Sequence, residues 1–369
     1  CALESIVLLK NDNNTLPVSD NVKKIAVIGP NAHDVEAQLG DWSFGPRYYP
    51  EKPMLEYNEY DISSIVTILD GIKKRAGNKV EILYDKGCDM FDSSNENIAG
   101  AVKLAQQADM VIAVVGDTIL LNGEVRDRSS LDLTGAQQKL LEALKNTGKP
   151  LVVVLINGKP LTVPWIKDNA DSIIEAWNPG MEGGNAVAAV LFGDYNPCGK
   201  ITISFPINVG QQPVYYNQYP GWHGPARYID VDPVPLFPFG YGLSYTSYKY
   251  SNMKVSPKEI AGEKAIREGE ITVSVEVTNT GKLKGTEIVQ LYINDIYSSV
   301  TTPIKELKGF SRVTIEPGET KTVEIKLPVH ALSLINRELK SVVEPGEFEI
   351  MVGSSSRDCD LLKEFIRVV

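Results

Sequence analysis

The chain has 369 residues, of which 43% are hydrophobic and 23% charged, and its formal net charge is −10 at pH 7. This length suits two or three domains with sizeable cores, and the composition excludes a disordered or fibrous chain. Lys and Arg are dispersed among acids, which argues against a nucleic-acid partner, and no apolar run approaches the roughly 18 residues of a membrane span.

The first segment, Cys1–Lys10, has apolar residues at helical spacing and no capping residue before it. It is typical of the middle of a helix. We therefore expect a helix here and interpret residues 1–21 as a linker segment from an upstream domain that is missing from this sequence.

Residues 22–206 alternate between apolar runs and amphipathic stretches. The apolar runs predict buried strands at Lys24–Pro30, Lys79–Tyr84, Met110–Val115, Leu151–Ile156, Ser172–Trp177 and Lys200–Phe205. Apolar residues at helical spacing predict helices over Ile62–Ala76, Ile98–Ala108 and Gly135–Asn146. Strands that are apolar throughout and separated by helices indicate a mostly parallel sheet covered on both faces, an α/β sandwich domain.

The hydrophobic pattern changes twice in the remaining sequence. Residues 207–247 lose periodicity and are rich in Pro, Gly and Tyr, which predicts an ordered connector. Residues 248–369 contain period-two runs that follow turn sequences, and these predict strands at Ile271–Thr278, Glu287–Ile293, Thr320–Leu327 and Gly346–Val352. About seven such strands predict an all-β sandwich of the immunoglobulin or fibronectin type.

A long loop follows the predicted strand Met110–Val115 and enters the next helix near Gly135. Ligands of a parallel sheet meet the loops at the carboxyl ends of its strands, and long ordered loops are often functional. Glu124 lies in this loop beside Arg126, Asp127 and Arg128. The cluster is either functional or a solvated group of charges that pair with one another.

Trp42 lies in the turn-rich stretch Gly40–Phe44 and follows Asp41 directly. Periodicity does not require its burial there. It is therefore either a platform on which a sugar ring stacks or a capped core residue.

Other common site patterns are absent. The four cysteines are far apart with no CxxC spacing, which disfavours a disulfide scaffold and a zinc site. Neither Ile28–Asn31 nor Gly180–Ala186 forms a GxGxxG phosphate loop, so a nucleotide-binding enzyme is disfavoured. The three histidines are dispersed and GxSxG is missing, which disfavours a Ser-His-Asp hydrolase.

Several strings match the signatures of one known family, and they occur in the family's order. They are Ser5–Asn11 with Leu16-Pro17, Trp177–Ala186, Leu191–Asp194, Asn196–Lys200, Pro235–Thr246, Val300–Phe310 and Pro317–Thr320. On these strings the chain resembles the C-terminal portion of glycoside hydrolase family 3, the group that contains bacterial β-glucosidases. The resemblance covers essentially the whole chain.

The resemblance implies an α/β sandwich domain followed by a fibronectin type III-like domain. It also implies that Glu124 is the general acid/base, because Glu124-Val-Arg-Asp127-Arg128 fits the family's Glu-Gly-x-Asp-Arg string with Val125 in place of the usual Gly. Asp127 and Arg128 would then shape the loop, and Trp42 would form a wall on the aglycone side. No metal or organic cofactor is implied.

Retaining glycosidases need two carboxyl groups about 5–5.5 Å apart. In this family the nucleophile is an Asp on an N-terminal (β/α)8 barrel, a fold of roughly 250 residues that we do not find in this sequence. The resemblance therefore implies the non-barrel part of a retaining exo-acting β-glucosidase that hydrolyses terminal non-reducing β-D-glucosyl residues, inactive as this chain alone. Its expected partners are a barrel domain, in cis or in trans, and β-linked gluco-oligosaccharides or aryl glucosides. The alternative is a non-catalytic carbohydrate-binding or scaffolding module that docks a separate barrel.

Overall fold

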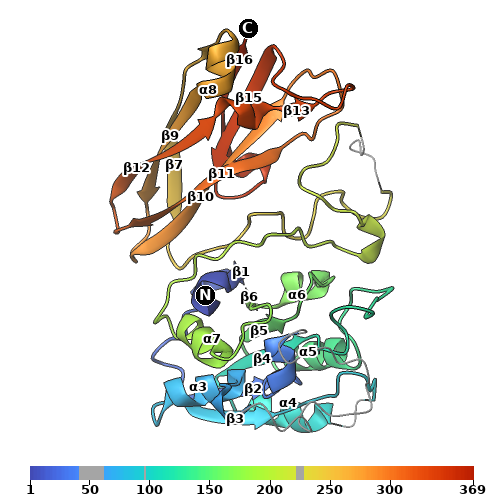
Figure 1. The fold of residues 1–369 in the computed structure, drawn as a ribbon. Helices are drawn as coiled ribbons and strands as arrows, with labels where there is room; N and C mark the ends of the chain where they lie inside the picture. Colours follow the sequence, from blue (N-terminus) through green and yellow to red (C-terminus); the bar gives the residue numbers. More distant parts are fainter. Residues whose placement is uncertain (41–61, 95–96, 222–227) are drawn as a thin grey trace. The chain divides into compact units, whose positions relative to one another are not determined.

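The computed structural model describes residues 1–40, 62–94, 97–221 and 228–369 (Figure 1). The chain divides into two compact units. The first comprises Cys1–Gly199 with Phe205–Gln212, and the second comprises Lys200–Ser204 with Pro213–Val369. Within the described ranges, no helix has both the length and the apolar character needed to cross a membrane.

The first unit contains, within its described residues, a six-stranded sheet in the order β1-β6-β5-β4-β2-β3 (Figure 1). The strands are β1 (Val7–Asn11), β2 (Lys24–Ile28), β3 (Glu81–Asp85), β4 (Met110–Gly116), β5 (Leu151–Ile156) and β6 (Ser172–Glu175). Strands β6, β5, β4, β2 and β3 run parallel, and β1 pairs with β6 in the antiparallel sense. The prediction of a mostly parallel sheet is confirmed.

Helices cover this sheet. They are α1 (Ala2–Ser5), α2 (Val35–Leu39), α3 (Ile68–Ala76), α4 (Ile98–Gln106), α5 (Gln137–Lys145), α6 (Pro164–Asn169) and α7 (Gly183–Leu191). Every residue of β4 and β5 is buried. Because successive side chains of a strand point to opposite faces, both faces of the sheet are covered. Helices α3 and α7 pack closely together, since a Cβ on Gly184 would lie only 1.9 Å from the carbonyl oxygen of Thr67.

Two segments at the start of the first unit differ from the sequence prediction. Only Ala2–Ser5 of the expected first helix is helical, and Val7–Asn11 is strand β1, because its backbone pairs with β6. Part of the predicted linker 1–21 is therefore a strand of the sheet. The helix expected over Ile62–Ala76 begins only at Ile68, because Thr67 Oγ1 accepts the backbone N–H of Asp70 as an N-cap.

The strand predicted at Lys200–Phe205 is also absent from the structure, which describes all six of these residues. Ile201 donates its N–H to Tyr241 O at 2.9 Å and accepts from Gly240 N at 2.8 Å. Its backbone hydrogen bonds are thus made with the Pro/Gly-rich connector rather than with the parallel sheet.

The second unit is an all-β sandwich with one short α-helix, α8 (Glu263–Glu268), in its described residues. One sheet has the order β11-β10-β15-β16-β8, the other β12-β9-β7, and β13 and β14 form a separate pair. The strands are β7 (Tyr248–Ser256), β8 (Glu259–Ile260), β9 (Glu270–Asn279), β10 (Gly285–Asp295), β11 (Glu306–Ile315), β12 (Thr320–Pro328), β13 (Leu334–Ile335), β14 (Ser341–Val342), β15 (Gly346–Gly353) and β16 (Leu361–Val368).

The core of the sandwich follows from the period-two pattern. In β9 the alternate residues Val273, Val275 and Val277 are buried, and they share one cluster with Val289 and Phe348 from the facing sheet. The four strands named from the sequence are present as β9, β10, β12 and β15. The predicted fold class, an α/β domain followed by a fibronectin type III-like sandwich, is confirmed.

Candidate active site

Polar side chains gather at the carboxyl edge of the parallel sheet in the first unit. Asn31 follows β2, Asp117 follows β4, Asn157 follows β5, and Glu175 is the last residue of β6. Asn31 Nδ2 donates to the carbonyl oxygen of Asp117 at 2.8 Å, and Asn157 Nδ2 donates to Glu175 Oε2 at 3.2 Å. Strands that are neighbours in the sheet thus bring together residues far apart in sequence, as is typical of ligand-binding edges in α/β folds.

Asp117 is the centre of this group. Its side chain is 0% exposed, and each of its carboxylate oxygens faces a cation. Arg128 Nη1 donates to Oδ1 at 2.7 Å, and Lys159 Nζ donates to Oδ2 at 2.7 Å. A buried carboxylate is strongly unfavourable unless it is paired, so these two contacts compensate for its desolvation.

The same two cations also hold the long loop that follows β4. Lys159 Nζ donates to the carbonyl oxygen of Leu121 at 2.7 Å and to Asn122 Oδ1. Arg128 Nη2 donates to the carbonyl oxygen of Asp132 at 2.6 Å. The loop is therefore attached to Asp117 on both sides of the segment that carries Glu124.

Glu124 lies in a tight turn within this loop. The turn runs from Gly123 to Arg126 and is closed by a 3.3 Å hydrogen bond from Arg126 N to Gly123 O. Val125, at the third position, has φ of +55°, which is the pattern of a type II turn and favours glycine. This conformation gives a physical reason for the glycine that is usual in the family's string. Glu124 itself is exposed, and Val125 is 78% exposed.

The structure separates the charged residues that the sequence placed together. Arg128 turns inward to Asp117, so it is not part of a purely solvated cluster. Asp127 is exposed like Glu124. Trp42 lies outside the described residues, and its role stays a prediction. Among the residues that the structure describes, no group of three or more His, Cys, Asp or Glu could hold a metal ion.

Glu175 is a second buried acid at this edge. Burial raises its pKa to about 8, and the nearby charge of Asp117 acts in the same direction. Two donors oppose this shift, since Trp177 N lies 2.8 Å from Oε1 and Asn157 Nδ2 lies 3.2 Å from Oε2. Glu175 therefore carries a proton at neutral pH. Its contact with the backbone N–H of Trp177 also supports that residue's left-handed conformation, φ +56°.

Sequence reasoning missed Asp117, Lys159 and Glu175. Each is a charged residue at or just after the end of an apolar run, which is the signal that could have identified them. Lys159 and Asp117 are 42 positions apart, however, and their pairing depends on β4 and β5 being neighbours in the sheet.

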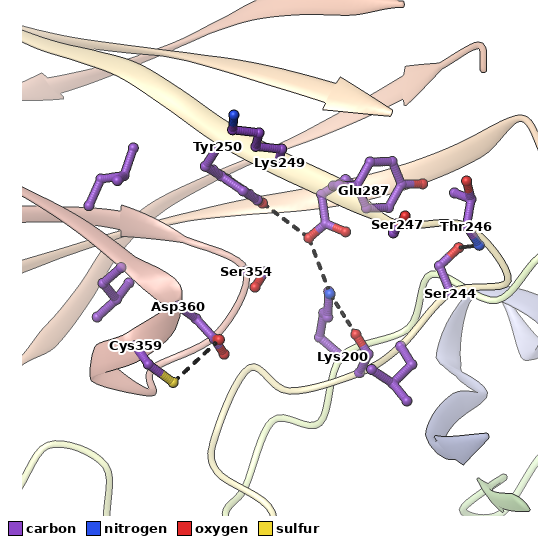
Figure 2. A pocket seen from close by; sticks show the side chains of 15 residues that line it. Lys200, Ser244, Thr246, Ser247, Lys249, Tyr250, Glu287, Ser354, Cys359 and Asp360 are labelled. Carbon is purple, nitrogen blue, oxygen red and sulfur yellow. Dashed lines mark hydrogen bonds and ion pairs between the residues drawn. The ribbon is translucent and has the colours of Figure 1, made fainter. Parts of the chain in front are cut away.

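A hollow of about 500 Å³ in the second unit is the other candidate (Figure 2). Figure 2 shows Glu287 between Lys200 and Tyr250. Lys200 Nζ lies 3.2 Å from Glu287 Oε1, and Tyr250 OH donates to the same oxygen at 3.1 Å. In this hollow the charges of Lys200 and Glu287 neutralise each other.

Comparison with known proteins agrees with this architecture. The model of the glycosyl hydrolase family 3 C-terminal domain matches residues 6–245, and that of the fibronectin type III-like domain matches residues 287–356. The chain belongs to glycoside hydrolase family 3. The resemblance found in the sequence is thereby confirmed.

Among the similar proteins, a beta-xylosidase of Formosa agariphila is 48% identical over 98% of this chain and 48% of its own length. A periplasmic beta-glucosidase of Salmonella typhimurium is 40% identical over 96% of this chain and 48% of its own length. The crystal structure of a beta-glucosidase from Listeria innocua in complex with glucose matches with a TM-score of 0.87 and 31% identity, covering 100% of this chain and 48% of that one. The chain thus spans about half the length of the curated relatives it matches.

Proposed function

We propose that this chain is the non-barrel part of a retaining, exo-acting β-glucosidase and that Glu124 is its general acid/base. The observation that carries the proposal is the setting of Glu124. It lies in an exposed turn of the long loop after β4, and the flanks of that turn are attached to a buried carboxylate. Membership of glycoside hydrolase family 3 supports glycoside hydrolysis as the chemistry.

The proposed reaction needs two carboxyl groups, one as nucleophile and one as acid/base. We place the nucleophile on a barrel domain outside this sequence, supplied in cis or in trans. Glu124 would protonate the glycosidic oxygen as the leaving group departs and would then deprotonate the water that releases the sugar. With one of the two carboxyl groups, the chain by itself is expected to be inactive.

The proposed substrates are β-linked gluco-oligosaccharides and aryl glucosides, cleaved at terminal non-reducing β-D-glucosyl residues. The names of the relatives support this class, since they include beta-glucosidases and a beta-xylosidase. Trp42 is proposed as a wall for the aglycone side. Its indole would stack on a sugar ring next to the bond that is cleaved.

The test is to replace Glu124 by Gln and by Ala in the complete enzyme with its barrel domain. A general acid matters most when the leaving group is poor, so kcat/KM on such a glucoside should fall about 10²–10⁴-fold. On an aryl glucoside with a good leaving group, kcat/KM should fall much less. Azide should restore part of the Glu124→Ala activity on that substrate, because this small anion can attack the glycosyl-enzyme in place of the water that Glu124 would deprotonate, which releases a glycosyl azide and the free nucleophile carboxylate.

Asp127→Asn is the matched control, because Asp127 is an exposed acid three positions further along the same loop. It should leave the dependence on leaving group unchanged. Unchanged hydrolysis of both substrates by Glu124→Gln would refute the assignment. If the complete protein binds glucose or cellobiose in calorimetry without turnover, the carbohydrate-binding or scaffolding alternative replaces it.

A further inference from the structure

We propose that Lys159 is a positioning residue for the general acid, holding the turn Gly123–Arg126 at a fixed place on the sheet edge. This inference rests on the proposed function, because it assigns Lys159 a role through Glu124. Lys159 is not part of the sequence string around Glu124. It lies 35 residues further along the chain, in the loop after β5.

All three N–H donors of the Lys159 ammonium group are engaged in hydrogen bonds within the protein. A lysine ammonium has three N–H donors. Here Nζ has three acceptors, namely Asp117 Oδ2, Leu121 O and Asn122 Oδ1. All three belong to the segment that leads from β4 to the turn. Lys159 therefore has no donor left for a substrate, and its effect on the reaction must pass through this segment.

The acceptors of Lys159 lie close to the turn that carries Glu124. Asn122 is the residue directly before Gly123, where the turn begins, and it is two positions from Glu124. The Lys159 side chain is 25% exposed, and its partner Asp117 is 0% exposed, so these contacts are shielded from most of the solvent. In such surroundings charge-assisted hydrogen bonds are stronger than on an open surface.

The backbone of Lys159 is held in place by a residue next to strand β5. Asn157 Nδ2 donates to the carbonyl oxygen of Lys159 at 2.9 Å, and Asn157 directly follows strand β5. The intervening Gly158 lets the two loops approach, since a Cβ there would lie 3.2 Å from Asn122 Cγ. The position of Lys159 is thus fixed by contacts next to a buried strand of the sheet.

Together with Arg128, Lys159 attaches the turn at two points. Arg128 joins the downstream side to Asp117 Oδ1 and to the carbonyl oxygen of Asp132. Removal of Lys159 would release the upstream side while the downstream side stays attached. Proton transfer needs a heavy-atom separation of about 2.6–3.2 Å, and a displacement of about 1 Å can reduce a rate about 100-fold.

The experiment compares Lys159→Met with Lys159→Arg, which keeps a cation and several donors. The matched control is Lys145→Met, because Lys145 is 33% exposed, pairs with Asp171 at 3.0 Å and lies at the end of α5, away from the loop after β4. In this chain, hydrogen exchange of residues 118–128 should accelerate at least about tenfold in Lys159→Met. It should stay unchanged in Lys145→Met and nearly so in Lys159→Arg.

In the complete enzyme, Lys159→Met should lower kcat/KM about 10–100-fold for a glucoside with a poor leaving group. For a glucoside with a good leaving group, kcat/KM should change by less than about threefold. Lys159→Arg should keep most of the wild-type kcat/KM on the substrate with the poor leaving group. An equal loss on both substrates, or faster exchange without any change in leaving-group dependence, would overturn the positioning role. Glu124→Gln, assayed in parallel, separates the two proposals. If Glu124→Gln leaves hydrolysis of the poor substrate unaffected, both proposals fall. If Glu124→Gln lowers that activity while Lys159→Met leaves it at the wild-type level, the positioning role alone falls.

Discussion

Asp117 in the first unit and Glu287 in the second are both buried carboxylates paired with a lysine, yet they stabilise different kinds of structure. Asp117 meets Lys159 and Arg128, and both cations reach on to main-chain carbonyls of one exposed loop. Glu287 meets Lys200 and the hydroxyl of Tyr250.

Glu287 and both of its partners lie in the second unit. Glu287 lies on β10 and Tyr250 on β7, so their contact joins the two sheets of the sandwich. Lys200 also donates to the carbonyl oxygen of Gly242 at 2.8 Å, which fastens the connector to the same pair. Glu287 thus stabilises a scaffold, whereas Asp117 stabilises the loop that presents a candidate catalytic residue. The chemistry of a buried ion pair does not reveal its role; the segments to which its partners belong do.

The largest expected effect comes from removing each acid. Asp117→Ala leaves two cations without their carboxylate, so the unfolding free energy of the first unit should fall by about 3–5 kcal/mol. Glu287→Ala leaves one cation, and the second unit should lose roughly 3 kcal/mol. Native-state hydrogen exchange of β4 and β5 against β9 and β10 measures the two units separately.

Each substitution should also leave the other unit unchanged. Faster exchange in the loop 118–128 is expected for Asp117→Ala and not for Glu287→Ala. If the hydrogen exchange of residues 118–128 accelerates equally in both variants, Asp117 and Glu287 do not differ in the way described above.

The next effect is a pH dependence that comes from Glu175. Its carboxyl holds a proton in the folded state up to about pH 8, whereas an ordinary glutamate releases it near 4.5. Because the folded pKa is raised, the stabilising contribution is complete below pH 4.5 and is lost as the pH rises through 8. Glu175→Gln stays neutral, so the stability of this variant relative to the wild type should grow with pH by up to about 1.4 kcal/mol per unit across this window.

Urea unfolding followed by tryptophan fluorescence at pH 5 to 9 checks this slope. Glu142→Gln is the control, since Glu142 is an exposed acid on α5 of the same unit. It should leave the pH dependence as it is in the wild type. A Glu175→Gln variant whose relative stability is flat between pH 5 and 8 would contradict burial of a protonated acid.

The smallest effect concerns the turn of Glu124. Val125 has φ of +55°, and a left-handed conformation costs a residue with a Cβ about 1–2 kcal/mol. Val125→Gly removes this strain but increases the entropy of the unfolded chain, so the first unit should gain at most about 1 kcal/mol.

Leu339→Gly provides the counterpart in the second unit, because Leu339 is exposed and has φ of +59°. Its gain should be smaller, since leucine is not branched at Cβ and tolerates this region better than valine. Thermal unfolding of both variants measures the difference. A loss of stability in Val125→Gly would mean that the added entropy of the unfolded chain, together with any lost side-chain contact, outweighs the relieved strain.

Much of the fold was predictable because local patterns and tertiary burial agree. The runs Met110–Val115 and Leu151–Ile156 are apolar throughout and are fully buried parallel strands, and Ile271–Thr278 alternates and is half-buried in the sandwich. Prediction failed where one pattern fits two structures. The residues Ile6–Leu9 are all buried, and a continuous apolar run of this length does not distinguish a helix from a strand.

The two kinds of domain, the long loop after β4 and the candidate acid Glu124 could be predicted from local features of the sequence, namely periodicity, turn residues and a matching string. Three contacts could not be predicted in this way: Val7–Asn11 joins the edge of the sheet, Ile201 pairs with the connector, and Lys159 contacts Asp117 and Asn122. These contacts depend on which strands lie side by side. The order of strands depends on which surfaces of the helices and strands are buried together, and it cannot be predicted from a short stretch of sequence.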